Sequence, residues 1–328
     1  MSPAPRSDWR PGAPLETLKK RAQLLKGLRA FFDARGVMEV DPPLLSRAAA
    51  PDVHLRSLSV EVQRPGVGSE RRWLPTSPEY PIKRLLCAGL GDCYALGHVF
   101  RDGDESSRHQ PEFMMLEWYR LGLDLDAIMD ETAALLGEML PGWRVERHRY
   151  DELFAEFAGI KEAYEAPASV FRQAMEAAGK SVAGVDAEDR LLWRQLVLTE
   201  IIEPRLAERE LVFVWGWPVE EAALAALSAD GRMALRFEVY AGGLELANGY
   251  QELREAGAYR RRFTAWNAER RARGLPEMPV DEALLAALED SGGLPACAGV
   301  ALGVDRLLMA QLGENDIRRV VPFAFGEA

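Results

Sequence analysis

The sequence predicts an α+β fold, in which helices cover an antiparallel sheet. Apolar segments joined by short polar or glycine-containing connections occur at residues 92–120 and 235–252, and such hairpins are typical of antiparallel strands. Sequence with helical spacing of apolar residues lies before, between and after them. Because strands joined by hairpins are interspersed with helices, we expect one α+β domain.

The first expected element is an amphipathic helix over about residues 15–35, where apolar residues recur at spacings of three and four and Gly36 ends the pattern. A short strand at residues 37–40 ends at a pair of prolines. Residues 57–65 and 71–75 predict a hairpin, and the helix that begins at Ser77-Pro78-Glu79 carries Lys83.

The next hairpin contains the most informative segment, FRDGDESSRHQPEFMMLEWYR, from Phe100 to Arg120. Side chains two apart on a strand share a face. One face of the second strand therefore carries Phe113, Glu117 and Tyr119, near Arg101 at the end of the first strand. The other face carries Met114, Leu116 and Trp118 and is expected to be core. The group suits a small ligand with phosphate, base and amine; an ordinary amphipathic hairpin is the alternative.

Residues 123–210 are expected to be mostly helical, with an insertion at about 150–210, and a strand follows at residues 211–215. A hairpin at 235–252, a polar helix and a strand at 299–302 come next. The last helix is expected to begin near Asp305, acting as its N-cap. Residues 1–14, polar and rich in proline, are expected to form a flexible tail ahead of one domain at 15–328.

Composition excludes several classes. With 328 residues, 48% hydrophobic content and no apolar run of membrane-spanning length, we expect a protein without a membrane span. Three cysteines without CxxC spacing argue against a disulfide framework and a zinc site, and favour a reducing cytoplasm. Four histidines show no metal-binding spacing.

The net charge of −11 gives no global basic surface for nucleic acid. One local exception is the arginine-rich stretch from Arg254 to Arg273. We favour a solvated helix face balanced by neighbouring acids; a docking surface for an acidic macromolecule is the alternative.

Nucleotide-binding motifs with a glycine-rich loop are absent. The sequence contains no GxxxxGK[ST], no GxGxxG after a strand and no kinase signature set. A nucleotide would therefore have to be held by arginines, carboxylates and an aromatic ring.

Three segments together resemble the signature motifs of class II aminoacyl-tRNA synthetases. The first helix with GVMEV and Pro43 resembles motif 1, Phe100 to Tyr119 resembles motif 2, and GVALGVDR from Gly299 resembles motif 3. TSPEYPIKRLL and GGLELANGYQEL are similar to the lysyl branch. Motif 1 builds the dimer interface in that family, so the resemblance implies a homodimer.

Lysyl-tRNA synthetases carry an N-terminal OB-fold domain, and a first helix at about Leu15 is expected to leave no room for it. The resemblance is therefore to the truncated bacterial branch, whose members activate (R)-β-lysine with ATP and transfer it to a lysine of elongation factor P rather than to tRNA. Ala301 stands where the tRNA-charging enzymes have glycine, which is expected to reshape the amino-acid pocket.

The resemblance implies a role for each motif residue. Arg101, Arg306 and Glu245 are expected to be catalytic. The residues expected to contact ATP are Arg101, Asp102, Gly103, His109, Gln110, Phe113, Glu245, Leu246, Gly303 and Arg306, with adenine between Phe113 and Arg306. Glu238 and Glu245 are expected to hold Mg²⁺. The residues expected to contact the amino acid are Ser77, Pro78, Glu79, Glu117, Tyr119, Asn248, Glu252 and Ala301.

Some details bear on this transfer of roles. Gly103 replaces a glutamate of the lysyl pattern, so Asp104 or Glu105 is expected to supply the carboxylate, and His109 could be an ordinary loop histidine. Glu245 and Glu252 are seven apart, and a one-residue bulge at Asn248-Gly249 is needed to place both on one face. Three pocket carboxylates are expected to require a ligand with two ammonium groups.

The expected reaction has two steps and no covalent enzyme intermediate: adenylate formation with release of pyrophosphate, then transfer with release of AMP. The alternatives are a lysine-activating enzyme that charges tRNA, and a non-catalytic binding protein.

Overall fold

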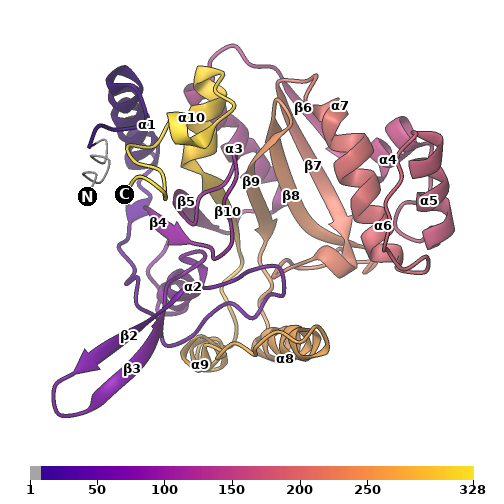
Figure 1. The fold of residues 1–328 in the computed structure, drawn as a ribbon. Helices are drawn as coiled ribbons and strands as arrows, with labels where there is room; N and C mark the ends of the chain where they lie inside the picture. Colours follow the sequence, from indigo (N-terminus) through magenta and orange to yellow (C-terminus); the bar gives the residue numbers. More distant parts are fainter. Residues whose placement is uncertain (1–8) are drawn as a thin grey trace, which may run out of the picture.

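The computed structural model describes residues 9–328, which fold around one large sheet (Figure 1). Its strands lie in the order β1-β4-β5-β10-β9-β8-β7-β6. Neighbouring strands are antiparallel, except that β1 is parallel to β4 and β6 is parallel to β7. Helices flank this mostly antiparallel sheet, so the predicted fold class is confirmed.

The bounds of the elements agree with most of the sequence-based expectations. The strands are β1 (Met38–Glu39), β2 (Ser59–Arg64), β3 (Gly68–Trp73), β4 (Cys93–Phe100), β5 (Glu112–Leu121), β6 (Val145–Arg149), β7 (Leu211–Pro218), β8 (Met233–Ala241), β9 (Leu244–Gln251) and β10 (Cys297–Gly303). The helices are α1 (Leu15–Asp33), α2 (Glu79–Cys87), α3 (Leu125–Met139), α4 (Tyr150–Ala158), α5 (Ala168–Ala177), α6 (Arg190–Val197), α7 (Glu203–Leu206), α8 (Ala256–Ala272), α9 (Glu282–Asp290) and α10 (Val304–Leu312).

Helices α1, α3 and α10 pack on one face of the sheet and build the largest core. Leu28 and Phe32 of α1, Ile128 of α3 and Leu307 of α10 are fully buried there. From β5, Leu116 and Trp118 are buried in the same core and Met114 packs against it. The predicted core face of this strand is therefore confirmed, and its other face is free to line a site.

A buried ion pair joins α1, β5 and α10. Arg21 Nη1 donates to Asp305 Oδ1, and the backbone N–H of Met114 donates to Asp305 Oδ2 at 2.8 Å. The prediction that Asp305 caps the last helix is wrong, because α10 begins at Val304 and Gly303 occupies the cap position. The carboxylate instead serves as the common acceptor of a cation and a backbone amide.

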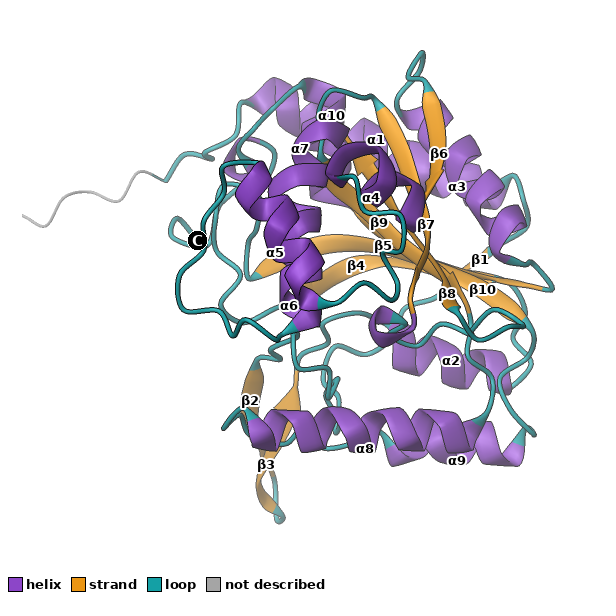
Figure 2. Ribbon diagram, turned by 90° about the vertical axis from the view of Figure 1, so that its right-hand side faces the viewer, coloured by secondary structure: helices purple, strands orange, loops and turns teal. Residues whose placement is uncertain are grey.

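Helices α2, α8 and α9 lie on the other side of the sheet, at the bottom of Figures 1 and 2. Ile82 and Leu86 of α2, Phe263 of α8 and Leu285 of α9 form a second apolar core there. Helix α9 was not predicted, although Asp281 caps it by accepting a hydrogen bond from Leu284 N at 2.9 Å. This core fixes α2 beneath the sheet.

The arginine-rich stretch lies mainly on α8. Arg260, Arg271 and Arg273 pair with Glu289, Glu277 and Glu269, all at 3.2 Å or less, so the solvated-face interpretation is confirmed for these three. It is wrong for Arg270, which is buried and donates to the carbonyl oxygens of Pro276 and Asp52. Its sequence neighbours give no sign that this one arginine turns inward.

Helices α4 to α7 form a separate bundle at the right of Figure 1 with their own apolar core. The helix that contains α6 widens into a π-turn at Leu198–Ile202 before α7, where Pro204 has no backbone N–H to donate. The expectation of mostly helical structure at 123–210 is wrong at β6. This strand is the polar sequence VERHR at the sheet edge, where few apolar residues are needed.

Near the N-terminus, the expected tail at residues 1–14 lies partly outside the described residues, and Gly12 N donates to Pro322 O at 3.1 Å. None of the helices in residues 9–328 is long and apolar enough to cross a membrane.

Candidate active site

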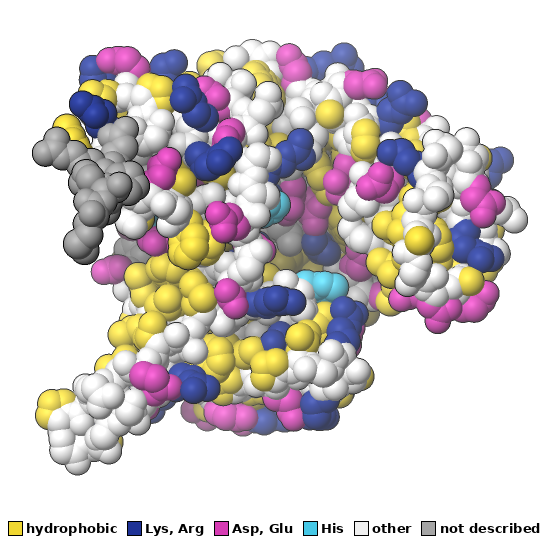
Figure 3. All heavy atoms as spheres, in the orientation of Figure 1, with side chains coloured by type: hydrophobic (Ala, Val, Ile, Leu, Met, Phe, Trp, Pro, Cys, Tyr) yellow, Lys and Arg dark blue, Asp and Glu magenta, His cyan; other side chains and the backbone are white. Residues whose placement is uncertain are grey.

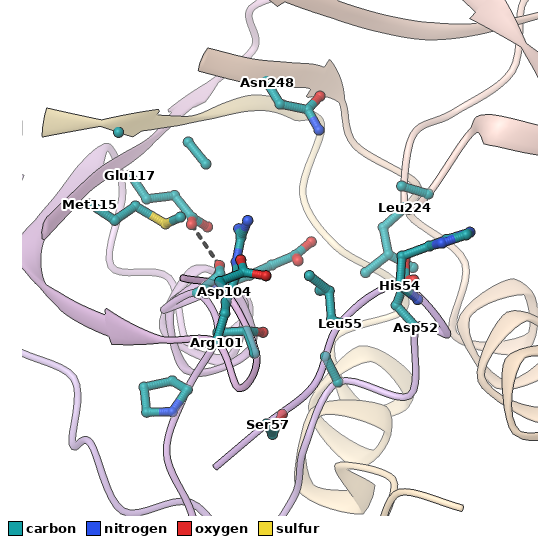
Figure 4. Close-up of a pocket in the computed structure, with 18 of the residues that line it drawn as sticks. Asp52, His54, Leu55, Ser57, Arg101, Asp104, Met115, Glu117, Leu224 and Asn248 are labelled. Atoms are coloured by element: carbon teal, nitrogen blue, oxygen red, sulfur yellow. Dashed lines mark hydrogen bonds between the residues drawn. The ribbon is translucent and has the colours of Figure 1, made fainter. Parts of the chain in front are cut away.

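A cleft of about 1400 Å³ opens on the face of the sheet opposite to α3. In the space-filling view the molecule is hollowed between the upper body, the α4–α7 bundle and the α8–α9 layer (Figure 3). Met115 and Glu117 of β5 and Asn248 of β9 face the cavity, and Asp52, His54 and Leu55 form an opposite wall (Figure 4). The strand face predicted to carry chemistry therefore lines the cleft.

At one end of the cleft an arginine lies over an aromatic ring. The guanidinium carbon of Arg101 is 5.1 Å from the centroid of the Phe113 ring, within the range of a cation–π contact. Burial lowers the pKa of Arg101, and its Nε has no hydrogen-bond partner in the described part of the chain. A buried guanidinium with free donors is suited to an anionic ligand.

Arg306 enters the same end from the first turn of α10. Its Nη1 donates to the carbonyl oxygen of Glu245 at 2.8 Å, and its Nη2 lies 2.6 Å from His109 Nε2. Burial and then the Arg306 charge lower the pKa of His109, which favours a neutral ring that accepts from Arg306. His109 therefore has a hydrogen bond to Arg306, although the residue is exposed on the loop.

The motif 2 loop places one of its two candidate carboxylates in the cleft. Asp104 lines it, whereas Glu105 does not. Gly103 has a φ of +80°, a left-handed conformation that favours glycine. Glycine in place of the glutamate of the lysyl pattern therefore allows a tight turn at this position. Gln110 points its amide oxygen to Phe325 N, at 2.8 Å.

At the other end of the cleft Glu117 is held by two hydroxyl groups. Ser77 Oγ donates to Glu117 Oε2 and Tyr119 OH donates to Glu117 Oε1, both at 2.6 Å. Burial, followed by the neighbouring Glu79 charge, raises the pKa of Glu117 to about 7, against the effect of both hydrogen bonds. Glu117 is therefore expected to lose its proton readily when a cationic ligand enters the pocket.

Two further carboxylates share a buried lysine. Lys83 Nζ lies 2.5 Å from Glu79 Oε1 and 2.6 Å from Glu252 Oε2. Tyr250 OH also donates to Glu79 Oε1, at 2.9 Å. Burial raises the pKa of Glu252 to about 8, although Lys83 opposes the rise. Lys83 therefore neutralises part of the charge of the three carboxylates, and the expectation that a ligand alone must do so is incomplete.

Glu238 and Glu245 lie on the neighbouring strands β8 and β9, and Glu245 is next to Arg306. Burial raises the pKa of Glu238 to about 8, and Glu245 contributes to the rise while Arg236 opposes it. Both oxygens of Glu238 are engaged, because Arg236 Nη2 donates to Oε1 and Tyr240 OH donates to Oε2 at 2.6 Å. Glu245 is more exposed and pairs with Arg306 at 3.6 Å. No cluster of three or more metal-ligating side chains occurs in residues 9–328.

A β-bulge brings Glu245 and Glu252 to the same cleft. Tyr240 pairs with Glu245 and Val239 with Ala247, so Leu246 is the additional residue. The predicted bulge therefore exists, but its predicted position at Asn248-Gly249 is wrong. Gly249 lies within the regular strand. A glycine is needed there because a Cβ would lie 2.6 Å from the Phe237 ring.

Most of the predicted site residues share this one cleft. The residues that line it are Ser77, Glu79, Arg101, His109, Gln110, Phe113, Glu117, Tyr119, Glu238, Glu245, Leu246, Asn248, Glu252, Ala301, Gly303 and Arg306. Pro78, Asp102 and Gly103 are not among the lining residues. The sequence analysis missed Lys83, Arg236 and Tyr250; the i, i+4 spacing of Glu79 and Lys83 on one helix was the available signal for the first.

Comparison with known proteins agrees with this geometry. The sequence model of the family "tRNA synthetases class II (D, K and N)" matches residues 7–326. The chain belongs to this family. The resemblance seen in the three motifs is thus confirmed for the class II family as a whole.

Relatives within the class II family match nearly the whole chain. An elongation factor P–(R)-β-lysine ligase of Vibrio cholerae serotype O1 is 44% identical over 324 residues, which cover 98% of this chain and 99% of that protein. Proteins of the same name from Mannheimia succiniciproducens and Haemophilus influenzae are 40% and 41% identical, each covering 98% of both chains. The resemblance to the truncated lysyl-type branch is confirmed.

Proposed function

We propose that this chain is an ATP-dependent, AMP-forming ligase that activates (R)-β-lysine and transfers it to a lysine side chain of elongation factor P. Ligases of that name are 44% and 40% identical to this chain over 98% of its length, which supports this function. The arrangement of the cleft supports it independently, because cationic and aromatic groups gather at one end and carboxylates at the other.

In the first step, a carboxylate oxygen of β-lysine attacks the α-phosphorus of ATP, and pyrophosphate leaves with the electrons of the broken P–O bond. Arg101 can bind oxygens of the substrate carboxylate and the α-phosphate together and stabilise the charge that develops on phosphorus. Phe113 and Arg306 are proposed to hold adenine between them. Positioning and charge stabilisation then provide the rate without a protein nucleophile.

In the second step, the acceptor amine attacks the carbonyl carbon of the adenylate, an amide bond forms and AMP leaves with the electrons of the carbon–oxygen bond. The amine must lose a proton during this step. Asp104 and Glu245 lie at the cleft walls near Arg101, where their charges act on its pKa. A substrate phosphate oxygen or either carboxylate can receive the proton.

The observation that carries the proposal is the carboxylate end of the cleft. Glu79, Glu117 and Glu252 surround one pocket, and Lys83 neutralises only one of their three charges, so an amino acid with an uncharged side chain would leave negative charge without a partner. A diamino acid supplies two ammonium groups. Its carboxylate then points to Arg101, the reacting end.

In this arrangement of the side chains, Glu245 is more available to bind Mg²⁺ than Glu238, whose two oxygens already have partners. Burial raises the pKa of Glu238 and the Glu245 charge adds to the rise, so a hard cation next to both carboxylates would offset their mutual repulsion. Arg236 already occupies one Glu238 oxygen. We propose that Glu245, and Glu238 after release from Arg236, hold Mg²⁺, which would neutralise phosphate charge.

The deciding experiment incubates the protein with ATP, Mg²⁺, (R)-β-lysine and elongation factor P, followed by intact-mass measurement of the factor. Addition of one β-lysyl group is expected. An unmodified factor, in a preparation that exchanges pyrophosphate with β-lysine, would refute the transfer step. Charging of tRNA with α-lysine in parallel tests the main alternative.

We also propose a homodimer in the cytoplasm, with residues 15–328 as one catalytic domain. The motif 1 segment carries exposed apolar side chains, with Met38 at 53%, Leu44 at 45% and Leu45 at 48% exposure, which a partner subunit could cover. Three free cysteines agree with a reducing compartment. Light scattering on the purified protein measures the oligomeric state.

A further inference from the structure

Lys83 is a charged side chain with no contact to solvent. Its exposure is 0%, and its ammonium group lies 5.2 Å from the ring centroid of Tyr259 and 5.7 Å from that of Tyr250. Burial opposes its charge, but Glu252 and Glu79 more than offset this and raise the pKa of Lys83. The two carboxylates therefore favour the ammonium form of Lys83.

Each carboxylate that binds Lys83 has one oxygen left for another cation. Lys83 takes Oε1 of Glu79 and Oε2 of Glu252. Both oxygens of Glu252 are buried without a regular hydrogen bond among residues 9–328; Oε2 has the Lys83 ion pair, and Oε1 has no such partner. Such an oxygen is costly unless a ligand satisfies it.

The charges around the pocket can be counted from the groups that face Lys83. The carboxylates that interact with Lys83 are Glu79, Glu117 and Glu252, and the neutral groups around them are the hydroxyls of Tyr80, Tyr119, Tyr250 and Tyr259 and the thiol of Cys297. Burial raises the pKa of these hydroxyls and of the thiol well above neutrality. With Lys83 protonated, the fully ionised pocket carries two net negative charges, which balance the two positive charges of the ligand's ammonium groups.

We infer that Lys83 is a positioning residue that sets the charge of the amino-acid pocket to match a substrate with two ammonium groups. It does not contact the substrate; it holds one oxygen of Glu79 and one of Glu252 and leaves the other oxygens for the substrate. This inference rests on the proposed function and names how that site selects a diamino acid.

A pair of variants separates this role from a structural one. In Glu79→Gln the pocket keeps Lys83 and only two carboxylates, so it carries one net negative charge and is under-charged for the substrate. Adding Lys83→Met restores two net negative charges. We therefore expect E79Q/K83M to have a KM for (R)-β-lysine about tenfold lower than E79Q, since one unpaired buried charge is worth at least that factor. A structural role predicts that the double variant is worse than E79Q.

The single variant Lys83→Met gives a second readout in the pH profile. Without the cation, the repulsion by Glu79 is no longer opposed and Glu252 takes up a proton more readily. The acid limb of kcat/KM for β-lysine is therefore expected to move to higher pH by about one unit or more. The KM for ATP should not change. Lys180→Met, which removes an exposed lysine paired with Glu200 at 3.1 Å, is the matched control.

Thermal-shift titration with (R)-β-lysine and with α-lysine measures binding without turnover, and E79Q/K83M is again expected to bind more tightly than E79Q. The inference is overturned if E79Q/K83M binds no more tightly than E79Q, or if K83M leaves the acid limb in place. Failure of the proposed function looks different, because the wild-type protein would then bind a diamino acid without modifying elongation factor P. If the wild-type protein binds no diamino acid, both proposals fail.

Discussion

Ser77 Oγ donates a hydrogen bond of 2.6 Å to Glu117 Oε2, although 40 residues separate the two in sequence. Ser77 lies just before α2 and Glu117 in the middle of β5, so the bond joins the two layers that enclose the amino-acid pocket. The same hydroxyl accepts a hydrogen bond from Glu79 N at 3.0 Å. One small side chain thereby positions two of the three pocket carboxylates.

Ser77→Ala is expected to shift the pH dependence of β-lysine activation. The hydrogen bond stabilises the anionic form of Glu117 and so lowers a pKa that burial has raised to about 7. Its loss lets the pKa rise further, by about half to one unit, and the acid limb of kcat/KM moves upward by the same amount. Pyrophosphate exchange from pH 5.5 to 9 measures this shift.

Ser69→Ala is the control for that experiment, because it removes a serine–glutamate hydrogen bond of 2.8 Å on the exposed β2–β3 hairpin. An unchanged acid limb in Ser77→Ala would show that Glu117 does not control substrate binding.

Stability without ligand is expected to fall as pH rises from about 4.5 to 8. The folded-state pKa values of Glu117 and Glu252, about 7 and about 8, lie above their ordinary value of 4.5. The folded protein therefore binds more protons than the unfolded chain in this range, and its free energy of unfolding decreases with pH. Calorimetry should show this decrease, and saturating β-lysine should reduce it. A Glu117→Gln variant with the wild-type slope would contradict the assignment.

Gly299→Ala and Gly303→Ala are expected to affect different substrates. A Cβ at Gly299 would lie 2.6 Å from Tyr119 Cε1 and 2.7 Å from Glu252 Oε1, both buried, so this variant should lose β-lysine binding. At Gly303 the nearest heavy atoms are 3.8 Å away, so the fold accepts the methyl group. If ATP passes over Gly303, this variant raises the KM for ATP alone; separate titrations of each substrate distinguish the two effects.

Arg101→Ala is expected to lower the rate of adenylate formation by about 10² to 10³-fold, as for loss of one preorganised charge-stabilising group. Arg101→Lys should recover only part of this rate, because an ammonium group cannot bind two oxygens in a fork. Single-turnover adenylation measures the step directly. Arg318→Ala, at an exposed arginine paired with Asp316, provides the control, and equal rates in both variants would remove Arg101 from the mechanism.

Ala301→Gly is expected to shift the preference from β-lysine toward α-lysine. Ala301 lies between Glu117 on β5 and Asn248 on β9, so its methyl group occupies the floor of the pocket beside both. Removing the methyl group creates space for the α-amine of the other isomer. The ratio of kcat/KM values for the two isomers is the measurement, and an unchanged ratio would refute this role.

The sequence could predict the features that depend on local periodicity. Alternation along β5 was enough to separate Glu117 and Tyr119 from Leu116 and Trp118, because a strand has two faces and one of them had to be buried. The order of the motifs then located both ends of the cleft.

Features that depend on packing between distant segments could not be read in this way. Lys83 looks like a solvated helical lysine until Tyr250 and Tyr259 enclose it. Nothing local distinguishes Leu246 from Asn248 as the bulge residue. Likewise, Asp305 resembles a helix cap in sequence because Arg21, its partner, is 284 residues away.

That last contact has a consequence for the nucleotide end of the cleft. Met114 N and Asp305 are joined directly, and their sequence neighbours Phe113 and Arg306 are the two sides of the proposed adenine slot. The Asp305 carboxylate therefore sets the distance between β5 and α10, and with it the width of the slot. A substitution at Arg21 in the first helix, 284 residues before Asp305, would therefore change the width of the proposed adenine slot.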